Sequence, residues 1–181
     1  MVLSRLQINI VLACIVAALG LAVIASYRSG RLHEVHGHPD VDASARIATL
    51  QRLIDREPGN PDYLARMGNL YYDLGQYDQA REFYQRSLDI RPHDPHVETD
   101  MATCFHYLGQ HDRSLQILDN VLSYRPDFAQ ARFNKGFVLI EGKGDKESGI
   151  AVWEDLLRSD PSFSQRAELQ QRIDNFKASA R

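Results

Sequence analysis

A pattern that recurs at a step of about 34 residues constrains the fold of this chain more than any other feature of its sequence. The first complete copy covers residues 61–94. The stretch Leu74 to Asp78, with Gly75 at its centre, interrupts this copy, and Pro92 closes it. Glycine commonly ends a helix and proline cannot continue one. The copy therefore predicts two helices joined by a short turn.

Small residues stand where two such helices would cross. Antiparallel helices approach closely only where the facing side chains are small, which places Gly68 and Ala80 at the crossing. Tyr71, Tyr84 and Leu88 are expected to fill the space around it. The copy thus predicts a helix-turn-helix hairpin.

The same marks return in two later copies. They are Ala102, Phe105, Leu108 to Asp112, Ser114, Leu118 and Pro126, and then Gly136, Leu139, Gly142, Gly149, Trp153 and Pro161. The last copy has one extra residue, which we expect in the turn from Glu141 to Glu147. Successive second helices are predicted to end before Pro58, Pro92, Pro126 and Pro161.

Short polar residues predict where the helices begin. Asn60 and Asp94 each precede a proline and are expected to cap a new helix. Asp78 is placed to cap the second helix of the first copy, and Asp42 a leading helix over residues 43–57.

The copy at 61–94 resembles a tetratricopeptide repeat (TPR). The resemblance is carried by Leu64, Met67, Gly68, Tyr71, Ala80, Tyr84 and Pro92, with Leu64 and Met67 in place of the family's Trp and Leu. It implies an all-α superhelix of about three helix-turn-helix repeats plus capping helices. An apolar N-terminal segment, described below, places one predicted transmembrane helix before this array.

The expected domains are an N-terminal membrane anchor (1–28), a polar tether (29–42) and a TPR domain (43–181). The last divides into a leading half repeat (43–60), repeats at 61–94, 95–128 and 129–163, and a C-terminal capping helix (164–181). The leading helix has an apolar face of Ile47, Leu50, Leu53 and Ile54. The end helix has one of Ala167, Leu169, Ile173 and Phe176. Such end helices keep the termini of a repeat array soluble.

Residues 6–27 contain no Asp, Glu, Lys, Arg or His. A helix of about 20 apolar residues spans the roughly 30 Å of bilayer hydrocarbon, so we interpret this segment as a retained membrane anchor. The alternative is a signal peptide cleaved after Val23-Ile24-Ala25. Arg5 and the amino terminus before the segment balance Arg28 and Arg31 after it, so charge does not determine the orientation.

The tether contains His33, Glu34, His36 and His38. Imidazoles at this spacing can bind a transition metal if a loop folds around it. We favour a flexible spacer because no rigid structure positions a further ligand. The alternative is a metal-dependent or enzyme-subunit role that uses the histidine cluster.

Motifs for catalysis are missing from the sequence. It has no phosphate-binding Gly-rich loop, no paired Cys motif and no nucleophile motif beside a His and an acid. Of the two cysteines, Cys14 belongs to the anchor and Cys104 is expected in the core. The formal net charge of −3 does not indicate nucleic-acid binding. We therefore predict no catalytic residues, cofactor, metal or small-molecule substrate.

The resemblance implies that the first helices of the repeats line a concave binding surface. The residues it places there are Asn69, Tyr72, Thr99, Thr103, His106, Tyr107, Phe133, Phe137, Ile140 and Glu141. Aromatic and hydrogen-bonding groups together suit a peptide or a partner helix. For Phe133 and Phe137 the alternative is burial under the end helix. The basic clamp with which some family members hold acidic chaperone tails is not reproduced, because Ala65 and Asp100 replace two of its residues.

The layout of anchor, tether and repeats is similar to that of membrane-anchored TPR proteins of bacterial cytochrome c maturation. This similarity implies a non-catalytic scaffold or peptide-binding adaptor in the assembly of a membrane or periplasmic complex. It also implies a single-pass protein of the bacterial inner membrane with its repeats in the periplasm, and a protein partner.

Overall fold

The structure, a computed structural model, describes residues 41–179. The predicted anchor, the cleavage site, Cys14 and the histidine cluster at 33–38 lie outside the described residues. Residues from Asp42 onward form one compact unit. Among the described helices, none is long and apolar enough to cross a membrane.

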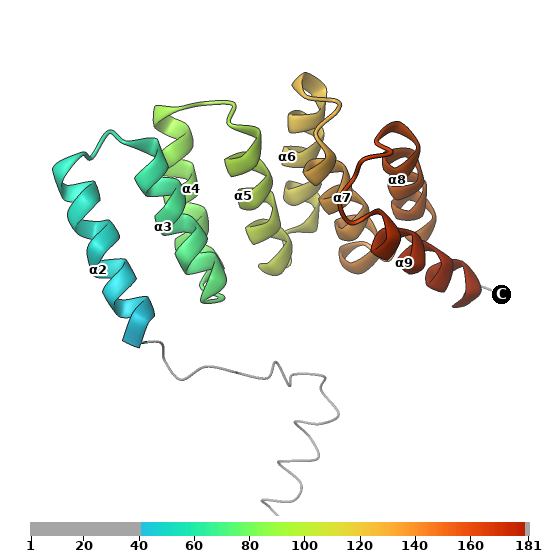
Figure 1. The fold of residues 1–181 in the computed structure, drawn as a ribbon, viewed down its shortest axis with the longest axis horizontal. Coiled ribbons are helices and arrows are strands. Elements are labelled where there is room, and N and C mark those ends of the chain that lie inside the picture. Colours follow the sequence, from blue (N-terminus) through green and yellow to red (C-terminus); the bar gives the residue numbers. More distant parts are fainter. Residues whose placement is uncertain (1–40, 180–181) are drawn as a thin grey trace, which may run out of the picture. The chain divides into compact units, whose positions relative to one another are not determined.

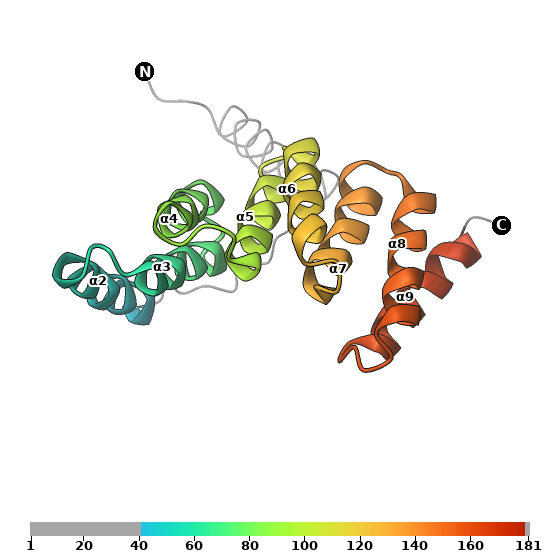
Figure 2. The same ribbon diagram turned by 90° about the horizontal axis from the view of Figure 1, so that it is seen from above.

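The described part consists of helices that follow one another side by side in chain order (Figure 1). They are α2 (Val41–Arg56), α3 (Pro61–Asp73), α4 (Tyr77–Ile90), α5 (Pro95–Tyr107), α6 (His111–Tyr124), α7 (Ala129–Phe137), the π-helix η1 (Val138–Gly142), α8 (Lys146–Ser159) and α9 (Arg166–Ser179). α3–α4, α5–α6 and α7–α8 form hairpins, and α5 also contacts both α3 and α7. Figure 2 shows α4 and α6 on the other side of the array from α3 and α7. The predicted all-α repeat array is confirmed.

The closing prolines mark the helix ends as predicted. α2, α4, α6 and α8 each end two residues before Pro58, Pro92, Pro126 and Pro161, respectively. Gly75 and Gly109, in the turns inside the first two hairpins, have φ of 71° and 75°, which glycine adopts without steric strain.

Small residues at the crossings allow the hairpins to close. A Cβ atom at Gly68 would lie 2.6 Å from Cδ1 and Cε1 of Tyr84, and Ala80 is fully buried. The same relation recurs in the third hairpin, where a Cβ atom at Gly136 would lie 2.3 Å from Nε1 of Trp153. Van der Waals packing at these distances excludes any larger residue unless the ring moves.

Two of the predicted caps are confirmed. Asn60 Oδ1 accepts a hydrogen bond from the Asp62 amide at 3.1 Å. Asp94 Oδ1 accepts from two backbone amides of α5, at 3.1 and 3.3 Å. Each cap satisfies N–H groups that have no partner within the helix.

The caps predicted for Asp78 and Asp42 are wrong. The turn after Gly75 is closed by a bond from the Gln76 amide to the Tyr71 carbonyl, so Gln76 is the N-cap of α4. Asp78 therefore lies inside the first turn, where it pairs with Arg81 at 3.5 Å. α2 begins at Val41, so Asp42 also lies within its first turn.

The extra residue of the third copy enters earlier than predicted. α7 widens into η1 at Val138, and the Lys143 amide bonds to the Val138 carbonyl at 3.1 Å, five residues back. Inserting one residue into a helix produces such a π-helix. Val138 and Ile140 both remain buried, at 1% and 4% exposure, because the widened turn absorbs the insertion without turning them to solvent.

The two end helices cover the apolar flanks of the array. Ile54 of α2 is buried with Leu64 and Met67 of α3. At the other end Leu169 and Ile173 of α9 are buried in a cluster with residues of α8 and η1. Ala167, predicted on the apolar face of the end helix, is exposed, whereas Leu169 two residues later is buried.

Candidate functional site

Three neighbouring pockets lie along the first helices of the repeats. We call them the acidic pocket (about 260 Å³), the central pocket (about 390 Å³) and the aromatic pocket (about 660 Å³). The first is lined by Asn69, Tyr72, Asp73, Tyr84 and Asp100. The second is lined by Tyr72, Asp100, Thr103, Tyr107, Gln130, Phe133, Asn134, Phe137 and Arg172. The third is lined by His96, Phe128, Ala129, Gln130, Phe133, Asn134, Asp160 and residues 162–165.

Adjacent pockets share walls. Tyr72 and Asp100 line both the acidic and the central pocket, and Gln130, Phe133 and Asn134 line both the central and the aromatic pocket. The three pockets therefore adjoin one another across α3, α5 and α7, and we call them together the groove.

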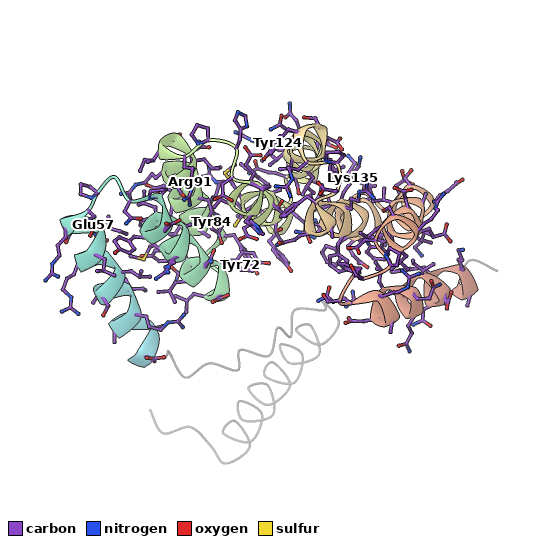
Figure 3. The ribbon with its side chains drawn as sticks, turned by 45° about the horizontal axis from the view of Figure 1, so that its top comes forward. Glu57, Tyr72, Tyr84, Arg91, Tyr124 and Lys135 are labelled. Atoms are coloured by element: carbon purple, nitrogen blue, oxygen red, sulfur yellow. The ribbon has the colours of Figure 1, made fainter. Side chains whose placement is uncertain are left out.

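The walls of the acidic pocket are fixed by hydrogen bonds. The Tyr84 hydroxyl donates to Asn69 Oδ1 at 2.7 Å, which ties α4 to α3. Figure 3 shows Tyr84 and Tyr72 near each other on this hairpin. Burial, followed by the charge of Asp100, raises the pKa of Tyr84, so this residue is a neutral phenol at physiological pH.

Asp100 lies at the junction of the acidic and central pockets and carries a half-buried carboxylate. Its Oδ1 accepts a hydrogen bond from Gln130 Nε2 at 3.2 Å. Burial raises the pKa of Asp100 from its ordinary value of 3.8 to about 6, although His96 and the bond from Gln130 act in the opposite direction. Within residues 41–179 no basic side chain forms an ion pair with this carboxylate.

A cluster of tyrosines forms one edge of the groove. The rings of Tyr77 and Tyr107 are stacked with centroids 4.6 Å apart. The Tyr72 ring lies edge-on to both, with centroid distances of 5.5 Å to Tyr77 and 6.0 Å to Tyr107. Tyr107 is 46% exposed. The cluster offers aromatic faces and hydroxyl groups to a bound molecule at little entropic cost, since the rings already hold one another.

Polar and aromatic side chains alternate further along the groove. Asn134 Nδ2 donates to Thr103 Oγ1 at 3.0 Å, which links α7 to α5. Phe133 stacks on Trp153 at 5.8 Å and lies 6.2 Å from Phe163. Trp153 in turn donates from Nε1 to the Phe133 carbonyl at 2.8 Å. These contacts place the aromatic pocket on a rigid support.

Six of the predicted binding residues line the groove. They are Asn69, Tyr72, Thr103, Tyr107, Phe133 and Phe137. Phe133 and Phe137 also pack against the core cluster of α8 and α9. The two alternatives for these phenylalanines therefore both hold in part, because each side chain has one face in the core and another toward the groove.

Four predicted residues do not line the groove. Thr99, His106 and Ile140 are buried at 0%, 8% and 4% exposure, and Glu141 is exposed but borders none of the three pockets. Thr99 belongs to the core-facing side of α5. Ile140 is turned toward Gly149 of α8 by the π-helix.

His106 is held by its neighbours at the end of α5. Its ring lies edge-on to that of Phe137, with the two centroids 5.1 Å apart, and its Nδ1 lies 3.2 Å from Nδ1 of His111. Burial, with the charge of His111 as a smaller cause, lowers the pKa of His106. Among the described residues no group of three or more His, Cys, Asp or Glu is placed to hold a metal ion.

The sequence prediction missed several groove residues, among them Asp73, Tyr84, Gln130 and Arg172 and most of the lining of the aromatic pocket. It named Asp100 as a departure from a known clamp and Asn134 as a residue kept at a clamp-like position. A usable signal existed for the last two. They occupy equivalent positions one repeat apart, each directly after a predicted groove residue.

Comparison with known proteins gives one family match. Residues 61–94 match the family model described as tetratricopeptide repeat. No curated protein matches the sequence.

Solved structures share the fold over most of the described chain. MamA residues 41 to the end from Desulfovibrio magneticus RS-1 superpose with a TM-score of 0.60 at 22% identity, over 76% of this chain and 80% of that one. YrrB, titled a TPR protein with an unusual peptide-binding site, superposes with a TM-score of 0.62 at 17% identity, over 71% of this chain and 66% of that one. The first TPR of Spaghetti (RPAP3), bound to the HSP90 peptide SRMEEVD, superposes with a TM-score of 0.56 at 19% identity, over 66% of this chain and 94% of that one.

At these identities the likeness establishes the fold alone. The sequence match and the fold agree on the same helical hairpin, α3–α4, with Gly68 and Ala80 at its crossing. Residues 61–94 match the tetratricopeptide-repeat model, and the described helices share their fold with solved structures that include the tetratricopeptide-repeat protein YrrB.

Proposed function

We propose that this protein is a non-catalytic interaction module that captures an extended segment of a partner protein in the groove. The observation that carries the proposal is the continuity of the three pockets across α3, α5 and α7. A small molecule would occupy one pocket, whereas a peptide can place successive side chains in all three.

The dimensions of the groove suit a short peptide. Packed helices lie roughly 8–10 Å apart, so a path across three of them is about 20 Å long. An extended chain advances about 3.3 Å per residue, which gives about six residues in contact. The lining supplies aromatic anchors in Tyr72, Tyr107 and Phe133, and amide groups in Gln130 and Asn134 for the peptide backbone.

The structural neighbours support this proposal as analogies. The RPAP3 repeat domain was solved with a bound peptide, and YrrB is described as having a peptide-binding site. The RPAP3 peptide SRMEEVD is acidic. The groove described above has carboxylates where such a peptide would need basic residues, so we do not propose an acidic tail as its partner.

We further propose that residues 6–27 anchor the module in the bacterial inner membrane with the repeats in the periplasm. There it would act as a scaffold in the assembly of a membrane complex, such as the one for cytochrome c maturation. The support is the apolar sequence of that segment and the layout of anchor, tether and repeats.

The topology is tested with a periplasmic reporter. Alkaline phosphatase fused after Arg181 should be active in a bacterial host, and the full chain should resist carbonate extraction. An inactive phosphatase together with an active cytoplasmic reporter would reverse the orientation. A soluble chain beginning near Ser26 would show that the segment is cleaved.

The groove is tested with paired variants. Crosslinking and capture from native membranes should lose the partner when Tyr72→Ala and Phe137→Ala are combined, because both side chains line the groove. Phe83→Ala is the matched control. That ring is also partly buried, but it stacks on Tyr71 away from the groove. Recovery of the same partner at the same yield by the folded double variant would refute the proposal.

A further inference from the structure

We infer that the acidic pocket selects a basic residue, so that the segment captured in the groove carries a lysine or arginine at the position that enters this pocket. The inference rests on the proposed function, since it states the chemistry of the peptide that the groove binds.

The charges of the acidic pocket are unbalanced. Asp73 and Asp100 line it, together with three uncharged residues, and no basic side chain is among its walls. Asp73 is also the last residue of α3, and the last turn of that helix contains no basic residue. The C-terminal end of a helix carries partial negative charge, which favours a cation. Two carboxylates and a helix end therefore create negative potential in one pocket.

The surroundings of Asp100 leave its charge uncompensated. Its charged neighbours at the start of α5 are Asp94, the N-cap residue, and His96, whose ring lies edge-on to that of Phe128 with centroids 4.9 Å apart. From α7 it receives only the neutral amide of Gln130. From α3 and α4 it faces the carboxylate of Asp73 and the phenol of Tyr84. Burial accordingly raises its pKa, and a bound cation would stabilise the ionised form.

A basic residue does occur nearby, on the far side of the central pocket. Arg172 of α9 lines that pocket but not the acidic one, and its guanidinium donates to Glu168 at 2.8 Å. Its charge is therefore already partnered within α9. The bound segment must supply the cation for the acidic pocket.

The size and walls of the acidic pocket fit one long side chain. Its volume of about 260 Å³ lies below the range typical of small-molecule sites. Tyr72 and Tyr84 supply aromatic surface for the aliphatic stem and for a cation–π contact. Asn69, held by the Tyr84 hydroxyl, supplies an additional polar group.

The test is a selection of short random peptides displayed on phage against the full chain, followed by binding measurements with the selected peptides. We expect one peptide position to be enriched in lysine or arginine. Replacing that residue by norleucine, which keeps the aliphatic stem and removes the charge, should weaken binding about tenfold or more. Asp100→Asn should weaken binding of the unmodified peptide similarly, and the two changes together should weaken it little further.

Matched controls separate charge from folding. Asp100→Asn keeps an oxygen that can accept from Gln130, and its thermal unfolding is compared with that of the wild type. Asp89→Asn changes a second aspartate that accepts from a glutamine, Gln85 at 2.9 Å, on the exposed surface of α4 outside the groove. This control should leave peptide binding unchanged.

The outcomes distinguish the two levels of the proposal. This inference is overturned, and peptide capture left intact, by either of two results. In the first, the selected peptides lose binding to the Tyr72→Ala variant but show no basic position. In the second, they bind the Asp100→Asn variant as tightly as the wild type. A selection that yields no peptide dependent on Tyr72 or Phe137 overturns peptide capture, and this inference with it.

Discussion

Asp100 should make the folded protein less stable at neutral pH than an uncharged residue would. Its pKa is about 6 in the folded state against an ordinary value of 3.8, so the folded chain binds this proton more tightly than the unfolded chain does. Stability therefore falls as the pH rises from about 4 to about 6, and the full penalty remains above that range.

The magnitude follows from the shift. Each pKa unit corresponds to about 1.4 kcal/mol, so a shift of about two units gives about 3 kcal/mol. Because the Asp100 side chain keeps some contact with solvent, we expect about 2 kcal/mol to be realised. Asp100→Asn removes this penalty and preserves an acceptor for Gln130.

The assay is urea unfolding followed by far-ultraviolet circular dichroism at several pH values. The variant should be more stable than the wild type by about 2 kcal/mol at pH 8, and the difference should vanish below about pH 4. Repeating both measurements in a His96→Gln background removes the electrostatic effect of this histidine on Asp100. A variant that is equally or less stable at pH 8 would refute the reasoning. A gain in stability with a loss of peptide binding is the pattern expected of a functional carboxylate.

Three further predictions concern the core. Gly68→Ala should lower the free energy of chemical unfolding by about 1–3 kcal/mol, because its Cβ would overlap the Tyr84 ring. Gly59→Ala is the control and should not lose stability by overpacking, because no atom lies within 4 Å of its Cβ position. Equal losses in the two variants would contradict the close helix crossing at Gly68. Cys104 is buried and burial raises its pKa to about 12, so iodoacetamide should label it at pH 8 only after unfolding, and rapid labelling of the native chain would argue against this burial. Burial lowers the pKa of His106, so the folded state resists protonation of this ring more than the unfolded chain does. The contribution of His106 to the free energy of unfolding should therefore be complete above its ordinary pKa of 6.5 and decline as the pH falls below it. An NMR titration that gives a raised pKa for His106 would disprove this.

The fold could be predicted from the sequence because its marks are local and periodic. A closing proline ends the preceding helix whatever surrounds it, and α4 ends at Ile90 for the reason that Pro92 follows. A glycine at a crossing is similarly informative, because Gly68 and Gly136 each make room for one large ring. Such features depend on the backbone and its nearest neighbour alone.

The groove was less predictable because it depends on the rotation of each helix. The repeat step placed Thr99 and His106 beside Tyr72, but both side chains of α5 are buried in the core. The π-helix then changes the phase of the third repeat and buries Ile140. Sequence periodicity assumes identical repeats, and the π-helix makes the third repeat differ from the other two.

Site-specific photocrosslinking tests the central claim, capture of a protein segment by the groove, most directly. A benzoylphenylalanine replaces either Tyr107, which lines the central pocket, or Ile90, at the end of α4 and outside the groove. The two positions are comparably exposed, at 46% and 43%, so random collisions should label both alike. Irradiation of native membranes should give a covalent adduct with one partner protein from position 107 and none from position 90. An adduct from position 90 alone, or the same adduct from both, would contradict the account.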